Sequence, residues 1–133
     1  MAILVLLVLA LFVIQTLIPG RFREPAAPGE PDSLKERLGN RDHMRPLTVI
    51  GQRAARALAN MQEAMRVFLG LAFLDMLTVP EAALAKTGAL LFLIARTVYV
   101  AIYMAGIPVV RSLVFVVGWV GLALMLTPIL QHL

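Results

Sequence analysis

The stretch LLFLIARTVYVAIYMAGIPVVRSLVFVVGWVGLALML, residues 90–126, decides the fold class. It joins two apolar runs through Gly106-Ile107-Pro108, and glycine and proline at this spacing end one helix and begin another. With its neighbouring residues, each run is long enough to cross the roughly 30 Å hydrocarbon core of a bilayer as a helix. The stretch therefore predicts two antiparallel membrane helices joined by a short turn.

Two further apolar segments extend this pattern toward the amino terminus. The first resembles a signal peptide in length, but no Lys or Arg precedes Arg21 and no small-residue cleavage motif follows the run. We expect it to be retained, which gives one membrane domain over residues 1–133. The predicted fold class is all-α, an integral membrane four-helix bundle with spans at about residues 2–18, 47–77, 81–104 and 108–130.

The composition agrees with lipid as the solvent. Apolar residues make up 60% of the chain and charged residues 15%, whereas soluble domains are nearer about 45–50% apolar and about 25% charged. The absence of cysteine excludes disulfides, thiolate catalysis by the protein and zinc–thiolate sites. His43 and His132 are far apart in the sequence, so no metal site is expected.

Residues 19–46 form a polar segment rich in proline, glycine and charged residues, which predicts an exposed loop with a short helix near Ser33–Leu38. Six of the chain's twelve Lys and Arg residues lie in this loop. The positive-inside rule therefore places the loop and the turn at 106–108 in the cytoplasm and both termini outside. Nucleic-acid binding is not expected, because the basic residues alternate with acidic ones or lie within spans.

Two polar faces lie inside the predicted spans. At 100° per residue, the second span carries four polar residues within about 80°, namely Arg53, Arg56, Asn60 and Glu63. The third span carries three within about 60°, namely Arg96, Tyr99 and Tyr103. A charge that faces lipid costs about 2.5 kcal/mol or more. These faces must therefore meet in a bundle interior, a subunit interface or a cavity.

Two explanations of the polar faces compete. Ion pairs of Glu63 with Arg53 or Arg56 would neutralise one arginine and leave the others without acceptors. An anionic ligand would satisfy more of them, because guanidinium groups bind carboxylates in a bidentate manner. We therefore favour an anion site, which Arg111 and Ser112 at the start of the fourth span would join, although Arg111 alone is also typical of an interfacial anchor.

Other residues of the spans have simpler interpretations. Arg66 lies off the polar face, and Asp75, near the outer end of its helix, is expected to be solvated. Small residues let helices approach closely, either within one chain or between subunits. The spans contain four that we expect to act in this way, namely Gly70, Ala72, Gly118 and Gly121.

Two stretches of the sequence resemble the MAPEG family, the membrane-associated proteins of eicosanoid and glutathione metabolism. The stronger match is the pattern A-R-x-x-Y-x-x-x-Y-x-x-G-x-P-x-x-R-S, which begins at Ala95 and ends at Ser112. The second is the run RAARALANMQE, residues 53–63, which resembles the family's R-x-x-x-N-x-x-E pattern. Length, span number and a polar first loop also agree with the family.

This resemblance implies a homotrimer that binds glutathione between neighbouring subunits, open to the cytoplasmic side, and acts on a lipophilic small molecule from the surrounding lipid. Arg56, Asn60 and Glu63 would hold the polar groups of the tripeptide. Five further residues of the stronger match would complete the site. Arg96, Tyr99 and Tyr103 would line the same pocket, and Arg111 would lie near the thiol with Ser112 beside it.

The resemblance implies a glutathione-dependent transferase or peroxidase in a bacterial inner membrane. Three residues depart from the catalytic members of the family. Ala59 replaces an arginine, Phe115 replaces a tyrosine, and Tyr99 replaces a histidine found in some members. These departures keep open the alternative of a membrane binding or scaffold protein with the same fold and no catalysis.

Overall fold

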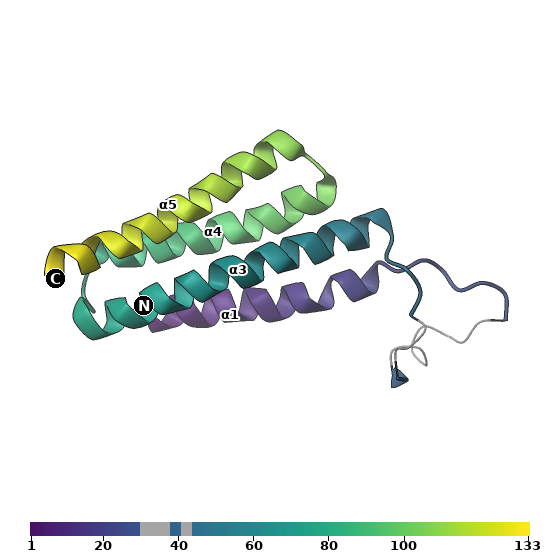
Figure 1. Cartoon of the computed structure of the whole chain (residues 1–133), viewed down its shortest axis with the longest axis horizontal. Coiled ribbons are helices and arrows are strands. Elements are labelled where there is room, and N and C mark those ends of the chain that lie inside the picture. Colours follow the sequence, from purple (N-terminus) through teal and green to yellow (C-terminus); the bar gives the residue numbers. More distant parts are fainter. Residues whose placement is uncertain (30–37, 41–43) are drawn as a thin grey trace.

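Four α-helices and one 3-10 turn make up the regular structure of the described residues, which are 1–29, 38–40 and 44–133 of a computed structural model (Figure 1). They are α1 (Ala2–Leu17), η1 (Pro19–Arg21), α3 (Val49–Thr78), α4 (Ala83–Ala105) and α5 (Pro108–His132). The helix bounds lie within two residues of the ranges expected from the sequence. The short helix expected near Ser33–Leu38 falls on residues 33–37, which lie outside the described part of the chain.

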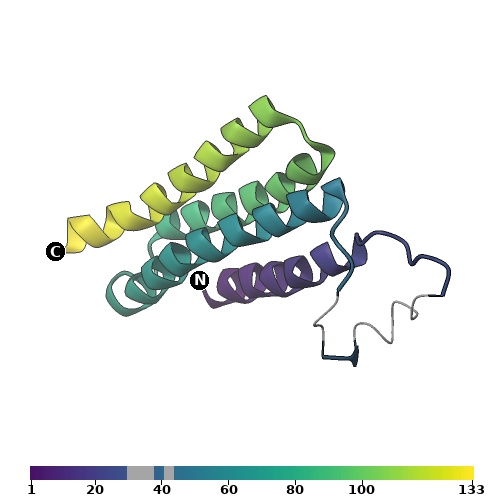
Figure 2. The same ribbon diagram turned by 45° about the vertical axis from the view of Figure 1, so that its right-hand side comes forward.

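The helices run up and down beside one another, and α3 packs against α1, α4 and α5 (Figures 1 and 2). The chain enters and leaves the bundle so that both termini lie at one end, here called the terminal end. The polar loop and the turn at 106–108 lie at the other end, here called the loop end. Short connections impose this antiparallel arrangement on α3, α4 and α5.

Three segments are long and apolar enough to cross a membrane, namely residues 2–21, α4 and α5. The fourth helix, α3, is different because its first half is charged. It has 30 residues, which corresponds to a length of about 45 Å. Thr48 caps its amino-terminal end, where the threonine hydroxyl accepts a hydrogen bond from Gly51 N. A polar first half on a helix this long places those charges at the loop end of the bundle.

The terminal end and the middle of the bundle hold an apolar core. Its centre is the stacked pair of Phe68 on α3 and Phe92 on α4, whose ring centroids are 4.8 Å apart. Fully buried side chains from the other helices surround this pair, including Val8 and Met125. The core therefore joins all four helices.

The closest contact between helices is made by two glycines, Gly88 on α4 and Gly121 on α5. A Cβ added to Gly88 would lie 2.9 Å from Met125 N, and one added to Gly121 would lie 2.9 Å from Phe92 N. The backbones therefore touch, as small residues permit in membrane helices. Toward the loop end α5 diverges from α4 and leaves room for large side chains (Figures 1 and 2).

Two polar side chains, Asp75 and Gln15, are buried in the bundle, and only for Asp75 was there an expectation from the sequence. Asp75 was expected to be solvated, and this expectation is wrong: it is 1% exposed and neither carboxylate oxygen has a hydrogen-bond partner. Gln15 on α1 is equally buried and its amide also lacks partners. Both lie on the inward face of their helices, and their depth follows from how α1 and α3 are rotated, which periodicity alone does not determine.

The two ends of the polar loop are tied together beside the start of α3. Thr48 N donates to Phe22 O at 2.9 Å, Glu24 N donates to Pro46 O at 3.1 Å, and Arg23 pairs with Leu47 in an isolated antiparallel bridge. Gly51 packs directly on this connection, since a Cβ there would meet Phe22. The first turns of α3, which carry the arginines, are therefore fixed against α1.

Candidate functional site

A small pocket at the loop end is lined by three arginines, two from α3 and one from α5, and by the turn between α4 and α5. Its volume is about 150 Å³, and its lining residues are Arg53, Arg56, Tyr103, Gly106, Ile107, Pro108 and Arg111. We call it the arginine pocket. The lining includes no acidic side chain, so its electrostatic potential is positive and suited to an anion.

Arg53 connects α3 to the end of α4. Its Nη1 donates to the carbonyl oxygen of Met104 at 3.3 Å. Gly106 ends α4 beside the same guanidinium in the left-handed conformation, with φ 77°, which favours glycine, and a Cβ there would displace the Arg53 side chain. Arg53 therefore fixes the turn that leads into α5, in addition to lining the pocket.

Arg111 enters the pocket from the first turns of α5. Its guanidinium carbon lies 4.9 Å from the centroid of the Tyr103 ring, within the range of a cation–π contact. Ser112 is exposed, and its hydroxyl donates to Pro108 O at 3.1 Å within its own helix. Of the two residues that the sequence placed together near the thiol, only Arg111 lines the pocket.

Arg96 and Tyr99 lie deeper in the bundle, and they are 2% and 6% exposed. The Tyr99 ring contacts that of Tyr103 edge-on, with centroids 5.4 Å apart. The structure thus brings together the three polar residues of α4 that the sequence grouped. Arg96 and Tyr99 lie in the interior of the bundle, however, and of these three residues only Tyr103 lines the arginine pocket.

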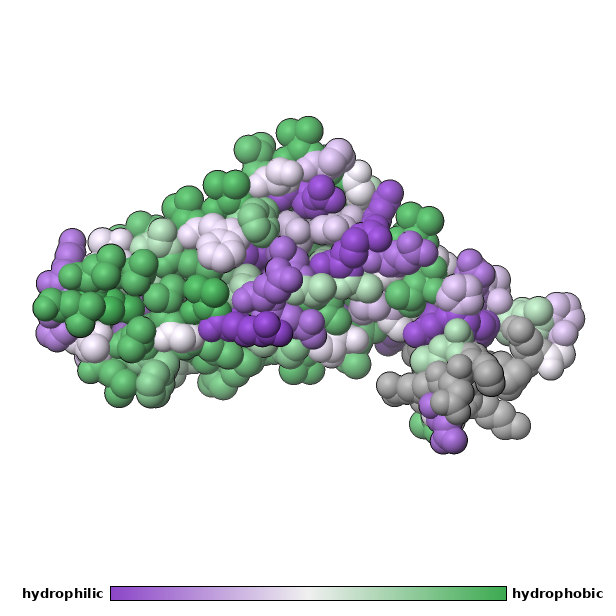
Figure 3. Space-filling view, viewed as in Figure 1, coloured by the Kyte–Doolittle hydropathy of each residue, from purple (hydrophilic) through white to green (hydrophobic). Residues whose placement is uncertain are grey.

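The polar face of α3 likewise contains both half-buried and exposed residues. Asn60 is half-buried and accepts a hydrogen bond of 2.6 Å from Arg96, whereas Arg56 and Glu63 are exposed. The ion pair of Glu63 with Arg53 or Arg56 that would have neutralised this face does not form. Hydrophilic residues lie mostly in the half of the molecule nearer the polar loop, on an otherwise apolar surface (Figure 3). Charge on this face therefore remains for a ligand or a second chain to satisfy.

Comparison with known protein families identifies the chain. The model of the MAPEG family matches residues 1–130, nearly the whole sequence. The chain belongs to the MAPEG family. Together with its apolar helices, this membership makes it an all-α, four-helix integral membrane protein of the kind that serves glutathione and eicosanoid metabolism. The comparison with curated proteins found no match.

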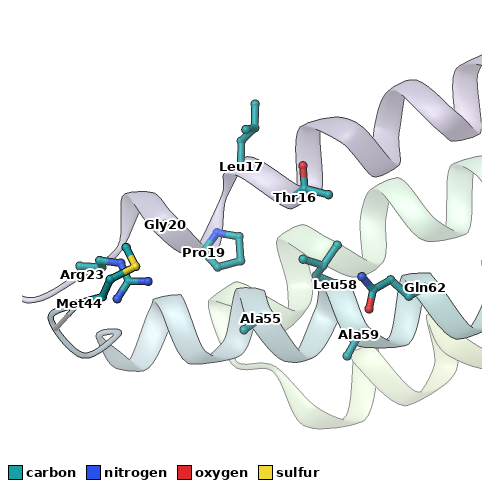
Figure 4. Close-up of a pocket in the computed structure, with 10 residues that line it drawn as sticks. All are labelled: Thr16, Leu17, Pro19, Gly20, Arg23, Met44, Ala55, Leu58, Ala59 and Gln62. Carbon is teal, nitrogen blue, oxygen red and sulfur yellow. The ribbon is translucent and has the colours of Figure 1, made fainter. Parts of the chain in front are cut away.

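A second, larger pocket of this MAPEG chain was not foreseen from the sequence. It has a volume of about 480 Å³ and lies between α1, η1 and α3 (Figure 4). Arg23 and Met44 lie together toward one end of it, and Leu58 and Gln62 toward the other. We call it the α1–α3 pocket. Thr16, Leu17, Pro19, Gly20, Ala55 and Ala59 complete its lining.

The two pockets lie on different sides of α3. At 100° per residue, Arg53 and Gln62 point about 180° apart. Arg23 is held by a hydrogen bond from its Nη1 to the carbonyl oxygen of Arg45. A proline-glycine break after an apolar helix, here Pro19-Gly20, was the one sequence signal that could have located this pocket, since it ends α1 where the pocket lies.

Proposed function

We propose that this MAPEG protein is a glutathione-dependent membrane transferase or peroxidase that acts on lipophilic electrophiles. One observation carries the proposal: three arginines and no carboxylate line one pocket at the loop end of the bundle. Glutathione has two carboxylates, one amine and one thiol. Guanidinium groups complement the carboxylates, and Glu63 on the exposed face of α3 complements the amine.

The side chains divide the work of binding and activation. Arg56, Asn60 and Glu63 hold the polar groups of the tripeptide, and Tyr103 supports Arg111 through its ring. Bound glutathione supplies a thiolate, which is the nucleophile in either reaction. The positive charge of Arg111 favours the ionised sulfur, so the thiol proton is released to solvent at neutral pH. Arg111 is therefore the residue to which we assign catalysis, and Ser112 next to it is the second candidate.

The electrophile reaches this site from the bilayer. The first turns of α5 expose Val109, Leu113 and Val116, which are 57–71% exposed and, at 100° per residue, point about 140–160° away from Arg111. An apolar molecule dissolved in the hydrocarbon contacts these side chains before it meets the charged pocket. We place the loop end on the cytoplasmic side of a bacterial inner membrane, with both termini outside, because the loop carries the excess of basic residues.

We further propose a homotrimer in which neighbouring chains share the site. The arginine pocket has about 150 Å³, less than the roughly 300–1,000 Å³ of typical ligand pockets. The α1–α3 pocket has a suitable size but lies on a different side of α3. A cyclic, head-to-tail assembly would place the α1–α3 pocket of one chain against the arginine pocket of the next. It would also cover the charges of Arg56 and Glu63, which otherwise face lipid.

Enzyme assays in detergent test the proposed activity. Purified protein is incubated with glutathione and a lipophilic aryl halide, and formation of the conjugate is measured. In a separate assay a fatty-acid hydroperoxide replaces the aryl halide, and formation of glutathione disulfide is measured. We expect turnover with at least one electrophile and loss of about 90–99% of it in Arg111→Ala, because a hydrogen bond to a charged group contributes about 1.5–3 kcal/mol. Arg66→Ala, which changes an exposed arginine outside both pockets, is the matched control. Turnover that is equal in both variants contradicts the assignment of Arg111.

A non-catalytic binding protein of the same fold is the second candidate. Phe115 favours it, because the position carries a ring without a hydroxyl, packed 6.4 Å from Tyr99 and 6.1 Å from Trp119 between ring centroids. A proton donor is therefore missing one turn after Arg111. Calorimetric titration with glutathione separates the two candidates, since saturable binding without turnover on either electrophile favours the binding protein.

A further inference from the structure

Arg96 is a cation without a counter-ion in the interior of the bundle. It is 2% exposed, and its one hydrogen bond runs from Nη1 to Asn60 Oδ1 at 2.6 Å. Its Nε and Nη2 are buried and have no partner in the described chain. Burying a charge in this way is costly, so its retention calls for a reason other than stability.

Aromatic rings close the space around the Arg96 guanidinium. Its central carbon lies 5.1 Å from the ring centroid of Phe92 and 5.6 Å from those of Tyr99 and Phe115. Gly118 on α5 closes the remaining side, since a Cβ there would lie 3.4 Å from Nε and Nη2. Arg96 is absent from the lining of the arginine pocket. It therefore acts on a ligand only through Asn60.

The chemistry of the contact determines which way the Asn60 amide points. A guanidinium carries only hydrogen-bond donors, so Asn60 must present its oxygen to Arg96. Its nitrogen, Nδ2, is then turned away from Arg96, and Asn60 shares a face of α3 with Arg56 and Glu63, which are exposed. Asn60 is half-buried, and Nδ2 has no partner within the described residues.

We infer that Arg96 is a positioning residue that locks the Asn60 amide with its Nδ2 hydrogens toward the ligand. The site then offers a donor pair at this position and selects a ligand with an acceptor oxygen, a carboxylate or an amide carbonyl. Without Arg96 the amide rotates freely and presents donor and acceptor alike. The identity of the ligand as glutathione rests on the proposed function, but the donor orientation does not.

Asparagine side-chain NMR reads this orientation directly. The chain contains two asparagines, Asn40 in the exposed loop and Asn60. Labelling asparagine with ¹⁵N at Nδ2 in the full-length protein in detergent therefore gives two side-chain amide signals, and Asn40 is the internal control. We expect added glutathione to shift the Asn60 signal in a saturable manner and to leave the Asn40 signal unchanged.

Three variants separate positioning from direct contact. Arg96→Lys keeps a donor opposite Oδ1, so we expect binding within about threefold of the natural protein. Arg96→Gln offers both a donor and an acceptor, and we expect glutathione to bind about 10–100-fold more weakly, the loss of one hydrogen bond to a charged group. Asn60→Asp retains the acceptor for Arg96 and removes the donor, so it should remain folded and lose affinity to the same extent. Fluorescence of the single tryptophan, Trp119, reports whether each variant is folded.

The outcomes distinguish this inference from the proposed function. Equal affinity in the natural protein, Arg96→Gln and Asn60→Asp overturns the inference, and so does a glutathione titration in which the Asn60 signal does not move while binding occurs. If glutathione fails to bind, succinate is the second probe. A saturable Asn60 shift with succinate supports the donor orientation and removes glutathione as the ligand. No Asn60 shift with either carboxylate overturns the inference.

Discussion

The two ends of this bundle are packed differently. At the terminal end α4 and α5 touch through Gly88 and Gly121, with no side chain between their backbones. At the loop end the same two helices diverge. The side chains of Arg96 and Phe115 occupy the space between them, and the arginine pocket lies at this end. The difference shows that close packing at one end of a helix pair makes room for polar chemistry at the other, because straight helices that cross at one point must separate elsewhere.

The comparison also explains why most of the charged residues lie toward the loop end. Apolar residues such as Phe68 and Phe92 fill the middle of the bundle at close distance, and a polar group there has no partner. Toward the loop end, polar groups have the headgroup region, the turn at 106–108 and one another as partners. Substitutions at the glycine contact should therefore affect stability, whereas those at the arginine pocket should affect ligand binding.

The largest change in stability is expected at the glycine contact. Gly121→Ala places a methyl group 2.9 Å from Phe92 N, so the helices must separate, at a cost of roughly 1–3 kcal/mol in the free energy of unfolding. Gly70→Ala is the matched control, because a Cβ there meets nothing within 4 Å. Thermal unfolding in detergent measures both. An equal effect of the two substitutions would show that the backbones are not in contact.

Asp75 is a buried acidic residue toward the terminal end, and removing its charge should stabilise the fold. Both oxygens are buried without a partner, and an unpaired buried polar group costs about 1–3 kcal/mol. We expect Asp75→Asn to raise the free energy of unfolding by about 1 kcal/mol at neutral pH. A chemical denaturation curve measures the change. Destabilisation instead would indicate that the carboxylate has a functional partner, such as a cation or a second chain.

Arg53 is expected to affect both stability and ligand binding, since it lines the arginine pocket and also holds the turn between α4 and α5. Arg53→Ala removes the hydrogen bond to Met104 O and should lower the free energy of unfolding by about 0.5–1.5 kcal/mol. Glutathione affinity should fall as well, because the turn no longer fixes Arg111. Calorimetry compares the variant with Arg66→Ala, for which we expect no change in either quantity. Loss of affinity without loss of stability would make Arg53 a ligand contact only.

The smallest effect is expected at the exposed ion pair of the terminal end. A hydrogen bond of 2.9 Å from Lys86 Nζ, together with the charge of that group, holds the pKa of the Glu81 carboxyl below its usual value. With a depressed pKa in the folded state, the interaction is present at neutral pH and is lost as the carboxyl protonates in acid. Glu81 is fully exposed, so solvent screens the pair, and Glu81→Gln should leave thermal unfolding unchanged. A clear change would place this turn against a partner.

The sequence was sufficient for the fold but for only part of the site. Apolar run lengths and the Gly106-Pro108 break predicted the four helices, because in lipid every backbone group must be satisfied within a helix. The expectation that small residues bring helices together was confirmed for Gly121. Its partner, Gly88, was missed because one glycine in an apolar helix gives no sign of the neighbour it meets.

Within the site, periodicity grouped polar residues correctly by helix face but did not give their depth. Arg96 and Tyr103 share a face of α4, yet one is enclosed by aromatic rings and the other lines the arginine pocket. Depth depends on how far α5 diverges from α4, which is a tertiary property. Asp75 was also expected in water and lies in the interior, because the rotation of α3 in the bundle turns it inward.

The central claim is that the arginine pocket ionises the thiol of bound glutathione, and ultraviolet difference spectroscopy tests it most directly. Glutathione is titrated into the protein in detergent at neutral pH, and the absorbance band of the thiolate is recorded for the natural protein, Arg111→Ala and Arg66→Ala. We predict a saturable thiolate band that is lost in Arg111→Ala and unchanged in Arg66→Ala. A band of equal size in Arg111→Ala, or saturable binding of glutathione without any band, would contradict the claim.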